Sequence, residues 1–142
     1  MENKKRVLVI DDNRTLVLAA RGVLQKNGYD VITALNGSEG LQKAEQEKPD
    51  VIVLDIVMPG MNGYEVGQKL KQTPETADIP IIFLSAKGNT DEKKGPTANG
   101  LKEIDKAFEC GANDFLNKPV KADALLASIK NVLWFSKMSS TG

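Results

Sequence analysis

Five short apolar runs, separated by longer segments with helical spacing, limit the folds that this chain can adopt. The runs are RVLVI (6–10), DVITAL (30–35), VIVLD (51–55), IPIIFLS (79–85) and NDFLNK (113–118). Nearly continuous Val, Ile and Leu is typical of strands buried on both faces of a parallel sheet. Parallel strands that alternate with helices place those helices on both sheet faces. The sequence therefore predicts an α/β domain with a doubly wound parallel sheet.

The segments between the runs carry helix signals. Asn62 and Glu65 have the spacing of a capping box at the start of a helix. An earlier helix is expected to end at Gly28, and its apolar face is formed by Leu16, Ala20, Val23 and Leu24. The last helix has an apolar stripe formed by Leu125, Leu126, Ile129, Val132 and Leu133.

Polar residues stand where the apolar runs end. Asp11 and Asp12 follow the first run, and Asp55 ends the third. Ser85 ends the fourth run, and Lys118 ends the fifth. Each of these residues alone has an ordinary explanation, as a helix cap or a turn. Because ligands of such sheets bind outside the carboxyl ends of the strands, the five together predict a shared site.

The composition of this site indicates phosphoryl chemistry with a hard metal ion. Asp11, Asp12 and Asp55 would repel one another, and a divalent cation relieves that repulsion. Carboxylates and water suit Mg²⁺ better than zinc. Asp55 can then attack phosphorus as a carboxylate nucleophile, while Lys118 and Ser85 contact the phosphoryl oxygens. The turn at 58–60, Met-Pro-Gly, leads the chain away and leaves Asp55 accessible.

The overall composition excludes several other classes of function. With no histidine, the chain has no Ser-His-Asp or Cys-His catalytic system and no His-ligated metal. Equal numbers of basic and acidic residues, 19 of each, give no sign of a surface for nucleic acid or membranes. A length of 142 residues suits one domain. One cysteine, Cys110, and no apolar span lead us to expect a cytoplasmic protein.

The chain resembles the receiver domain of bacterial two-component response regulators. The stretches that carry the resemblance are VLVIDDN, VIVLDIVMPGMNG, IPIIFLSAKG and GANDFLNKPV. The resemblance implies a flavodoxin-like fold with strand order 2-1-3-4-5. We expect the receiver domain at 1–137, followed by a disordered tail at 138–142. The resemblance also implies that Asp55 accepts a phosphoryl group from a histidine kinase or phosphotransfer protein. Such a protein is not an enzyme, apart from slow autodephosphorylation.

The resemblance assigns further roles to individual residues. Asp11, Asp12 and Asp55 would hold Mg²⁺ together with the backbone carbonyl of Val57. Ser85, Lys118 and the backbone amide of Ala86 would bind the phosphate. Ser85 and Phe115 would form the conformational switch, and the bond from Lys118 to Pro119 would be cis.

One interval departs from the family pattern. Ser85 and Lys118 are 33 positions apart (118 − 85), and the family's interval is shorter by about ten residues, a difference that a surface loop accommodates at low entropic cost. We expect the insertion in GNTDEKKGPTANG, at 88–100, as a loop. Its place beside Ser85 puts the usual switching surface in question.

Two other functions remain open at this level. A haloacid-dehalogenase-type phosphatase also uses an Asp nucleophile with Mg²⁺, but it needs a second Asp two residues later. Here those positions hold Asn13 after Asp11 and Val57 after Asp55. The other alternative is a receiver-like module that binds partners without phosphorylation.

Trp134 suggests a contact surface on the last helix. At about 100° per residue it lies about 140° from Ile129, away from the apolar stripe. In the resembling family, the face of helix 4, strand 5 and helix 5 is a common surface for dimers or effectors. We therefore expect Trp134 and Phe135 to pack against a second subunit or a downstream segment. The alternative is that Trp134 folds back onto its own domain.

Overall fold

The computed structural model describes residues 4–85, 109 and 111–140, and a five-stranded parallel sheet forms its centre. The strands follow the order β2-β1-β3-β4-β5, which confirms the order implied by the resemblance. Each strand lies within two residues of a predicted apolar run. They are β1 (Arg6–Ile10), β2 (Asp30–Ala34), β3 (Val51–Asp55), β4 (Ile81–Ser85) and β5 (Ala112–Asn117).

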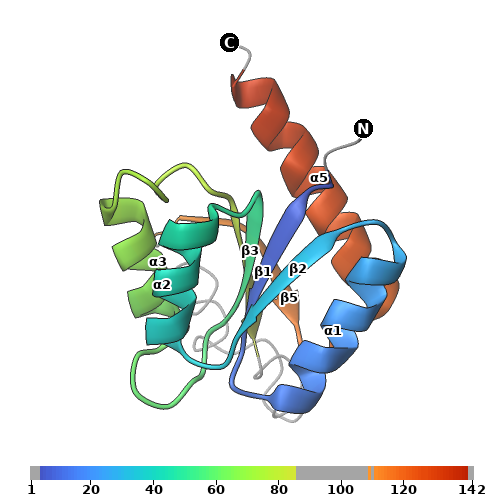
Figure 1. Cartoon of the computed structure of the whole chain (residues 1–142), viewed down its shortest axis with the longest axis horizontal. Helices are drawn as coiled ribbons and strands as arrows, with labels where there is room; N and C mark the ends of the chain where they lie inside the picture. The colour runs from blue at the N-terminus through green and yellow to red at the C-terminus, as the bar shows by residue number, and fades with distance from the viewer. Residues whose placement is uncertain (1–3, 86–108, 110, 141–142) are drawn as a thin grey trace, which may run out of the picture.

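Helices cover both faces of the sheet, as Figure 1 shows. The described helices are α1 (Arg14–Lys26), α2 (Gly37–Glu47), α3 (Gly63–Gln72) and α5 (Ala122–Ser140). One core cluster joins α2 and α3 to the sheet through Ala44, Val66 and Leu70. The other joins α1 and α5 to it through Leu24 and Ile129. The predicted doubly wound α/β fold is therefore confirmed.

Alternate residues of the central strands enter opposite core clusters. In β1, Leu8 and Ile10 pack toward α2 and α3, whereas Val7 and Val9 pack toward α1 and α5. The same alternation holds in β3 and β4, and all of their residues are buried. Because both faces of these strands need apolar side chains, their sequences lack the polar alternation of a strand with one wet face.

The helix ends follow the local sequence signals. Asn62 and Glu65 form the predicted capping box at the start of α3. Asn13 caps α1 by accepting a hydrogen bond from the Leu16 amide, at 3.1 Å. Gly28 follows α1 with a φ of +91°, a conformation that a residue with a Cβ rarely adopts. The predicted end of α1 is confirmed.

The C-terminal helix differs from expectation in its length. The predicted stripe is confirmed, with Leu125, Ile129 and Val132 buried against the sheet. However, α5 continues to Ser140, so the prediction of a disordered tail at 138–142 is wrong for 138–140. The sequence from Ala122 to Ser140 contains no glycine or proline that would end the helix earlier. Residues 141–142 and the expected insertion at 88–100 lie outside the described residues.

Within the described part of the chain, none of the helices combines the length and apolar character that crossing a membrane requires.

Candidate functional site

The carboxyl ends of β1 and β3 bring three carboxylates together. Asp11 directly follows β1, and Asp55 is the last residue of the neighbouring strand β3. Asp11 and Asp55 are buried, with 0% and 1% of their surface exposed, whereas Asp12 is exposed. One carboxylate oxygen from each of the three lies within 4.8 Å of the others. The structure therefore confirms the predicted meeting of the three acids.

Lys118 lies between the two buried carboxylates. Its Nζ is 2.8 Å from Asp11 Oδ2 and 3.2 Å from Asp55 Oδ1. The backbone amide of Lys118 donates a 2.7 Å hydrogen bond to the carbonyl of Ser85, the last residue of β4. This bond holds the end of β5 beside the end of β4. The Lys118 ammonium thus contacts two carboxylates, one directly after β1 and one at the end of β3.

Backbone hydrogen bonds position both acids. The Asp11 amide donates to the Ala34 carbonyl of β2 at 3.1 Å, and Asp11 Oδ1 accepts from the Asn13 amide at 2.9 Å. On the other strand, the amide of Ile56, the residue after Asp55, donates to the Leu84 carbonyl at 3.1 Å. Both acids are thus held on the rigid frame of the sheet, as precise chemistry requires.

Gly63 is a supporting residue that the sequence analysis did not single out. It is the first residue of α3, and its amide donates a 2.8 Å hydrogen bond to the Ile56 carbonyl. A Cβ at this position would lie 2.3 Å from the Asp55 carbonyl oxygen and 2.7 Å from Ile56 Cα. Only glycine allows α3 to begin this close to the Asp55 backbone. The available signal was a glycine directly after the N-cap Asn62, where helix propensity alone would not favour it.

Burial and charge both change the ionisation of Asp55. Loss of hydration, reinforced by the negative charge of Asp11, raises the pKa of Asp55 from 3.8 to about 7, against the opposing effect of Lys118. For Lys118, burial alone would lower the pKa, but its contacts with Asp11 and Asp55 outweigh burial and raise it. Among the described residues, three carboxylates of this cluster are thus accompanied by one lysine, Lys118.

The donor set fits a hard divalent cation. Asp11 Oδ2 and Asp55 Oδ1 are buried and accept no hydrogen bond from the described residues, so their ion pairs with Lys118 leave coordinating capacity unused. Asp12 adds an exposed carboxylate beside them, open to water. Mg²⁺ favours a few carboxylate ligands together with several waters. These three residues therefore fit the predicted ion.

The remaining predicted site residues lie around this cluster. Ser85 is buried at the end of β4, and Val57 is exposed just beyond β3. Phe115 is partly buried on β5, opposite Phe83 of β4. The peptide bond from Lys118 to Pro119 is cis, as expected. Ala86, whose amide was expected to bind phosphate, lies outside the described residues.

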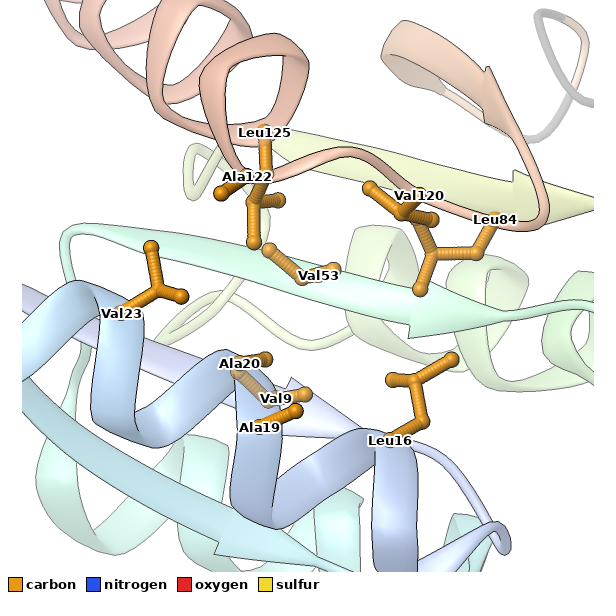
Figure 2. Close-up of a pocket in the computed structure, with 10 residues that line it drawn as sticks. All are labelled: Val9, Leu16, Ala19, Ala20, Val23, Val53, Leu84, Val120, Ala122 and Leu125. Carbon is orange, nitrogen blue, oxygen red and sulfur yellow. The ribbon is translucent and has the colours of Figure 1, made fainter.

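An apolar cavity of about 120 Å³ lies between α1, the sheet and the start of α5. Figure 2 shows its side chains, all from apolar residues. They are Val9, Leu16, Ala19, Ala20, Val23, Val53, Leu84, Val120, Ala122 and Leu125. Because this lining has no nucleophile, acid, base or metal ligand, the cavity is not the reacting site. The carboxylate cluster at the strand ends is therefore the candidate site.

The pKa of Asp55 predicts how stability depends on pH in the absence of metal. The folded pKa, about 7, lies above the unfolded value of 3.8, so folding favours the protonated form. The contribution of Asp55 to stability is therefore greatest below about pH 4, and it should fall by a few kcal/mol as pH rises toward about pH 7. Chemical denaturation in EDTA across this range measures the effect.

Asp55→Asn should remove most of this pH dependence, since asparagine does not ionise. Asp30→Asn is the matched control, because Asp30 is an exposed residue at the start of β2. An equal loss of stability with rising pH in wild type and Asp55→Asn would contradict the assignment.

Comparisons with known proteins agree on one family. The family model described as "Response regulator receiver domain" matches residues 7–130. Protein PilH of Pseudomonas aeruginosa is 38% identical to this chain over 90% of the chain and 97% of PilH.

The chain also matches part of a longer protein. It is 39% identical to the alkaline phosphatase synthesis transcriptional regulatory protein PhoP of Bacillus subtilis, over 96% of this chain and 51% of PhoP. Among solved structures, a CheY-like response regulator receiver domain protein from Methanospirillum hungatei superposes with a TM-score of 0.83 at 26% identity. That alignment covers 96% of this chain and 99% of the other.

Proposed function

The chain belongs to the response regulator receiver domain family, and we propose that it accepts a phosphoryl group on Asp55 in a Mg²⁺-dependent reaction. The donor is a histidine kinase or a phosphotransfer protein. One observation carries this proposal: the Lys118 ammonium bridges two buried carboxylates, Asp11 and Asp55, whose oxygens keep unused coordinating capacity.

Asp55 is the nucleophile in this proposal. One of its carboxylate oxygens attacks phosphorus, a bond from phosphorus to that oxygen forms, and the bond to the donor's leaving group breaks with its electron pair. Asp11, Asp12 and Asp55, with the Val57 carbonyl, would hold Mg²⁺, which supplies positive charge for the phosphoryl oxygens. Because the pKa of Asp55 is about 7, positive charge nearby also favours its ionised, nucleophilic form.

Ser85, at the end of β4, and Lys118, directly after β5, would contact the oxygens of the phosphoryl group. The Lys118 ammonium is already within 3.2 Å of Asp55 Oδ1, so it can contact a phosphoryl oxygen after a small movement. Ser85 ends β4, the strand next to β3, and its hydroxyl is proposed to donate to the same group. The amide of Ala86 is proposed as a further donor.

Ser85 and Phe115 form the proposed switch. Phosphorylation draws the Ser85 hydroxyl toward Asp55, and Phe115 turns into the space left behind, as a population shift between two packings. The partial burial of Phe115 beside Phe83 supports this, because the ring is in contact with the core without being enclosed. Equal Phe115 rotamer populations with and without a phosphate mimic would contradict it.

The output is proposed to be contact with another protein. The face of helix 4, strand 5 and helix 5 would bind a second copy or a downstream effector, with Trp134 as one anchor. Trp134 is exposed, so it does not fold back onto its own domain. We place this signalling in the cytoplasm, without direct contact to nucleic acid or membrane, and assign the protein no catalytic turnover beyond slow autodephosphorylation.

Intact-mass measurement with acetyl phosphate and Mg²⁺ tests the proposal. One added phosphoryl group is expected in wild type and in the control Asp30→Asn, and none in Asp55→Asn or in EDTA. Unchanged labelling of Asp55→Asn would overturn the assignment of Asp55. Steady release of inorganic phosphate from small phosphomonoesters would favour the phosphatase alternative, and partner binding without labelling would favour the phosphorylation-independent module.

A further inference from the structure

The outer side of α5 is unusual for a helix exposed to water. Trp134, Phe135 and Met138 are 57%, 63% and 53% exposed. The opposite side of α5 is also apolar, because Leu125, Ile129 and Val132 pack on the sheet. A helix on the surface of a protein normally carries polar and charged residues on its outer face, so three large apolar side chains exposed on α5 are unusual.

Five exposed positions of α5, which include Trp134 and Met138 but not Phe135, follow a coiled-coil spacing. Positions 124, 127, 131, 134 and 138 are separated alternately by three and four residues, and they hold Ala, Ala, Asn, Trp and Met. At about 100° per residue they form one stripe on the side away from the sheet. All of them are exposed. This stripe, 124–138, is called the outer stripe below.

Charged residues border the outer stripe along one edge. Asp123, Lys130 and Lys137 are spaced by seven residues, so they form a row beside it, and all three are exposed. Asp123 lies at the beginning of α5, and Lys137 lies near its end. Asp123 Oδ1 accepts a 2.9 Å hydrogen bond from the Ala124 amide.

Side-chain size and charge both change along the outer stripe, from its N-terminal part to its C-terminal part. Its N-terminal part has small side chains, Ala124 and Ala127, beside an acid, whereas its C-terminal part has Trp134 beside a base. A second copy of α5 running antiparallel would place the large side chain over the small ones. The same alignment brings Asp123 of each copy to Lys137 of the other. In a two-fold interface the same surface of both copies must be complementary to itself, and the outer stripe meets this requirement in the antiparallel alignment.

We propose that two copies of this chain associate through an antiparallel pair of α5 helices packed along the outer stripe. In this alignment Trp134 covers Ala124 of the second copy, and Asn131 lies beside Ala127. Lys130 approaches its own equivalent near the two-fold axis, which opposes association but leaves both ammonium groups in water. The zero net charge of the chain adds no long-range repulsion between copies.

α5 is longer than the strands that it covers. A helix of 19 residues is about 28 Å long, longer than the five-residue strands at about 17 Å. Figure 1 shows the last turns of α5 extending past the sheet at the end where β1 begins. The interface uses α5 alone, on the side away from its core contacts. It shares Trp134 with the face proposed above but uses no residue of strand 5.

Sedimentation equilibrium of the full chain without phosphodonor tests the association. A weak dimer is expected, with a Kd on the order of 100 µM, from a small interface of this kind. Trp134→Ala should weaken it at least about tenfold, because a central tryptophan often dominates an interface. Leu18→Ala is the matched control, since Leu18 is 58% exposed on α1 and lies outside the stripe. A monomer at every concentration would overturn the proposal.

A charge exchange tests the orientation. Asp123→Lys or Lys137→Asp alone should weaken the dimer by about threefold to tenfold, and the two together in one chain should restore it. Disulfide formation in a Cys110→Ser background adds a second measure. A mixture of Ala127→Cys and Asn131→Cys chains should cross-link faster between the two variants than within either one.

Cross-linking of each variant to itself, or no recovery in the charge exchange, would overturn the antiparallel arrangement. Because no phosphodonor is used, either failure leaves the proposed phosphorylation of Asp55 unaffected.

Discussion

Replacing Lys118 with methionine should lower the rate of Asp55 phosphorylation by about 100-fold or more, the usual effect of removing a donor that stabilises transition-state charge. Methionine keeps an unbranched apolar stem but removes the ammonium, which lies 2.8 Å from Asp11 Oδ2 and 3.2 Å from Asp55 Oδ1. Without it, the two buried carboxylates oppose both the ionisation of Asp55 and the approach of an anionic donor.

The measurement is the rate of labelling by acetyl phosphate at saturating Mg²⁺, with circular dichroism to verify folding. Lys121→Met is the matched control, because Lys121 is exposed three residues further along the chain. A rate for Lys118→Met within about threefold of wild type would mean that the ammonium makes little difference to the transition state.

Gly63→Ala should destabilise the fold by about 3 kcal/mol, at the upper end of the cost of an added methyl group in a packed site. The new Cβ would meet the Asp55 carbonyl oxygen at 2.3 Å, so α3 or the end of β3 must move. That movement also disturbs the 2.8 Å hydrogen bond from the Gly63 amide to Ile56. Labelling of Asp55 should fall together with stability.

Gly22→Ala provides an opposite control for urea denaturation. Gly22 lies within α1, and a Cβ there would meet no atom within 4 Å. Alanine is the better helix former, so this variant should be more stable by about 0.5–1 kcal/mol. Equal stabilities of Gly63→Ala and wild type would show that α3 can shift away from Asp55 at no cost.

The elements of the fold and the location of the site were predictable from the sequence because their signals are local. A strand buried on both faces needs nearly continuous apolar residues, and β1, β3 and β4 have them. The Asn62–Glu65 capping box marks the start of α3 within four residues. Once parallel strands alternate with helices, their carboxyl ends must share one edge, and this brings Asp11 and Asp55 together.

Other properties were decided by the tertiary structure. The sequence does not show that Asp11 and Asp55 are buried while Asp12 is exposed, and the pKa of Asp55 depends on that difference. The need for glycine at position 63 arises from the approach of α3 to the β3 backbone. Strand order came from the resemblance to a family, because apolar runs do not specify which neighbour each strand takes.

The difference has one physical cause. Apolar periodicity, helix caps and helix-ending residues act over a few neighbouring positions, so they can be recognised in the sequence. Burial, the distance from Lys118 to two acids, and the space beside a backbone atom depend on residues far apart in the chain. Those quantities acquire values only when the strands pair and the helices pack.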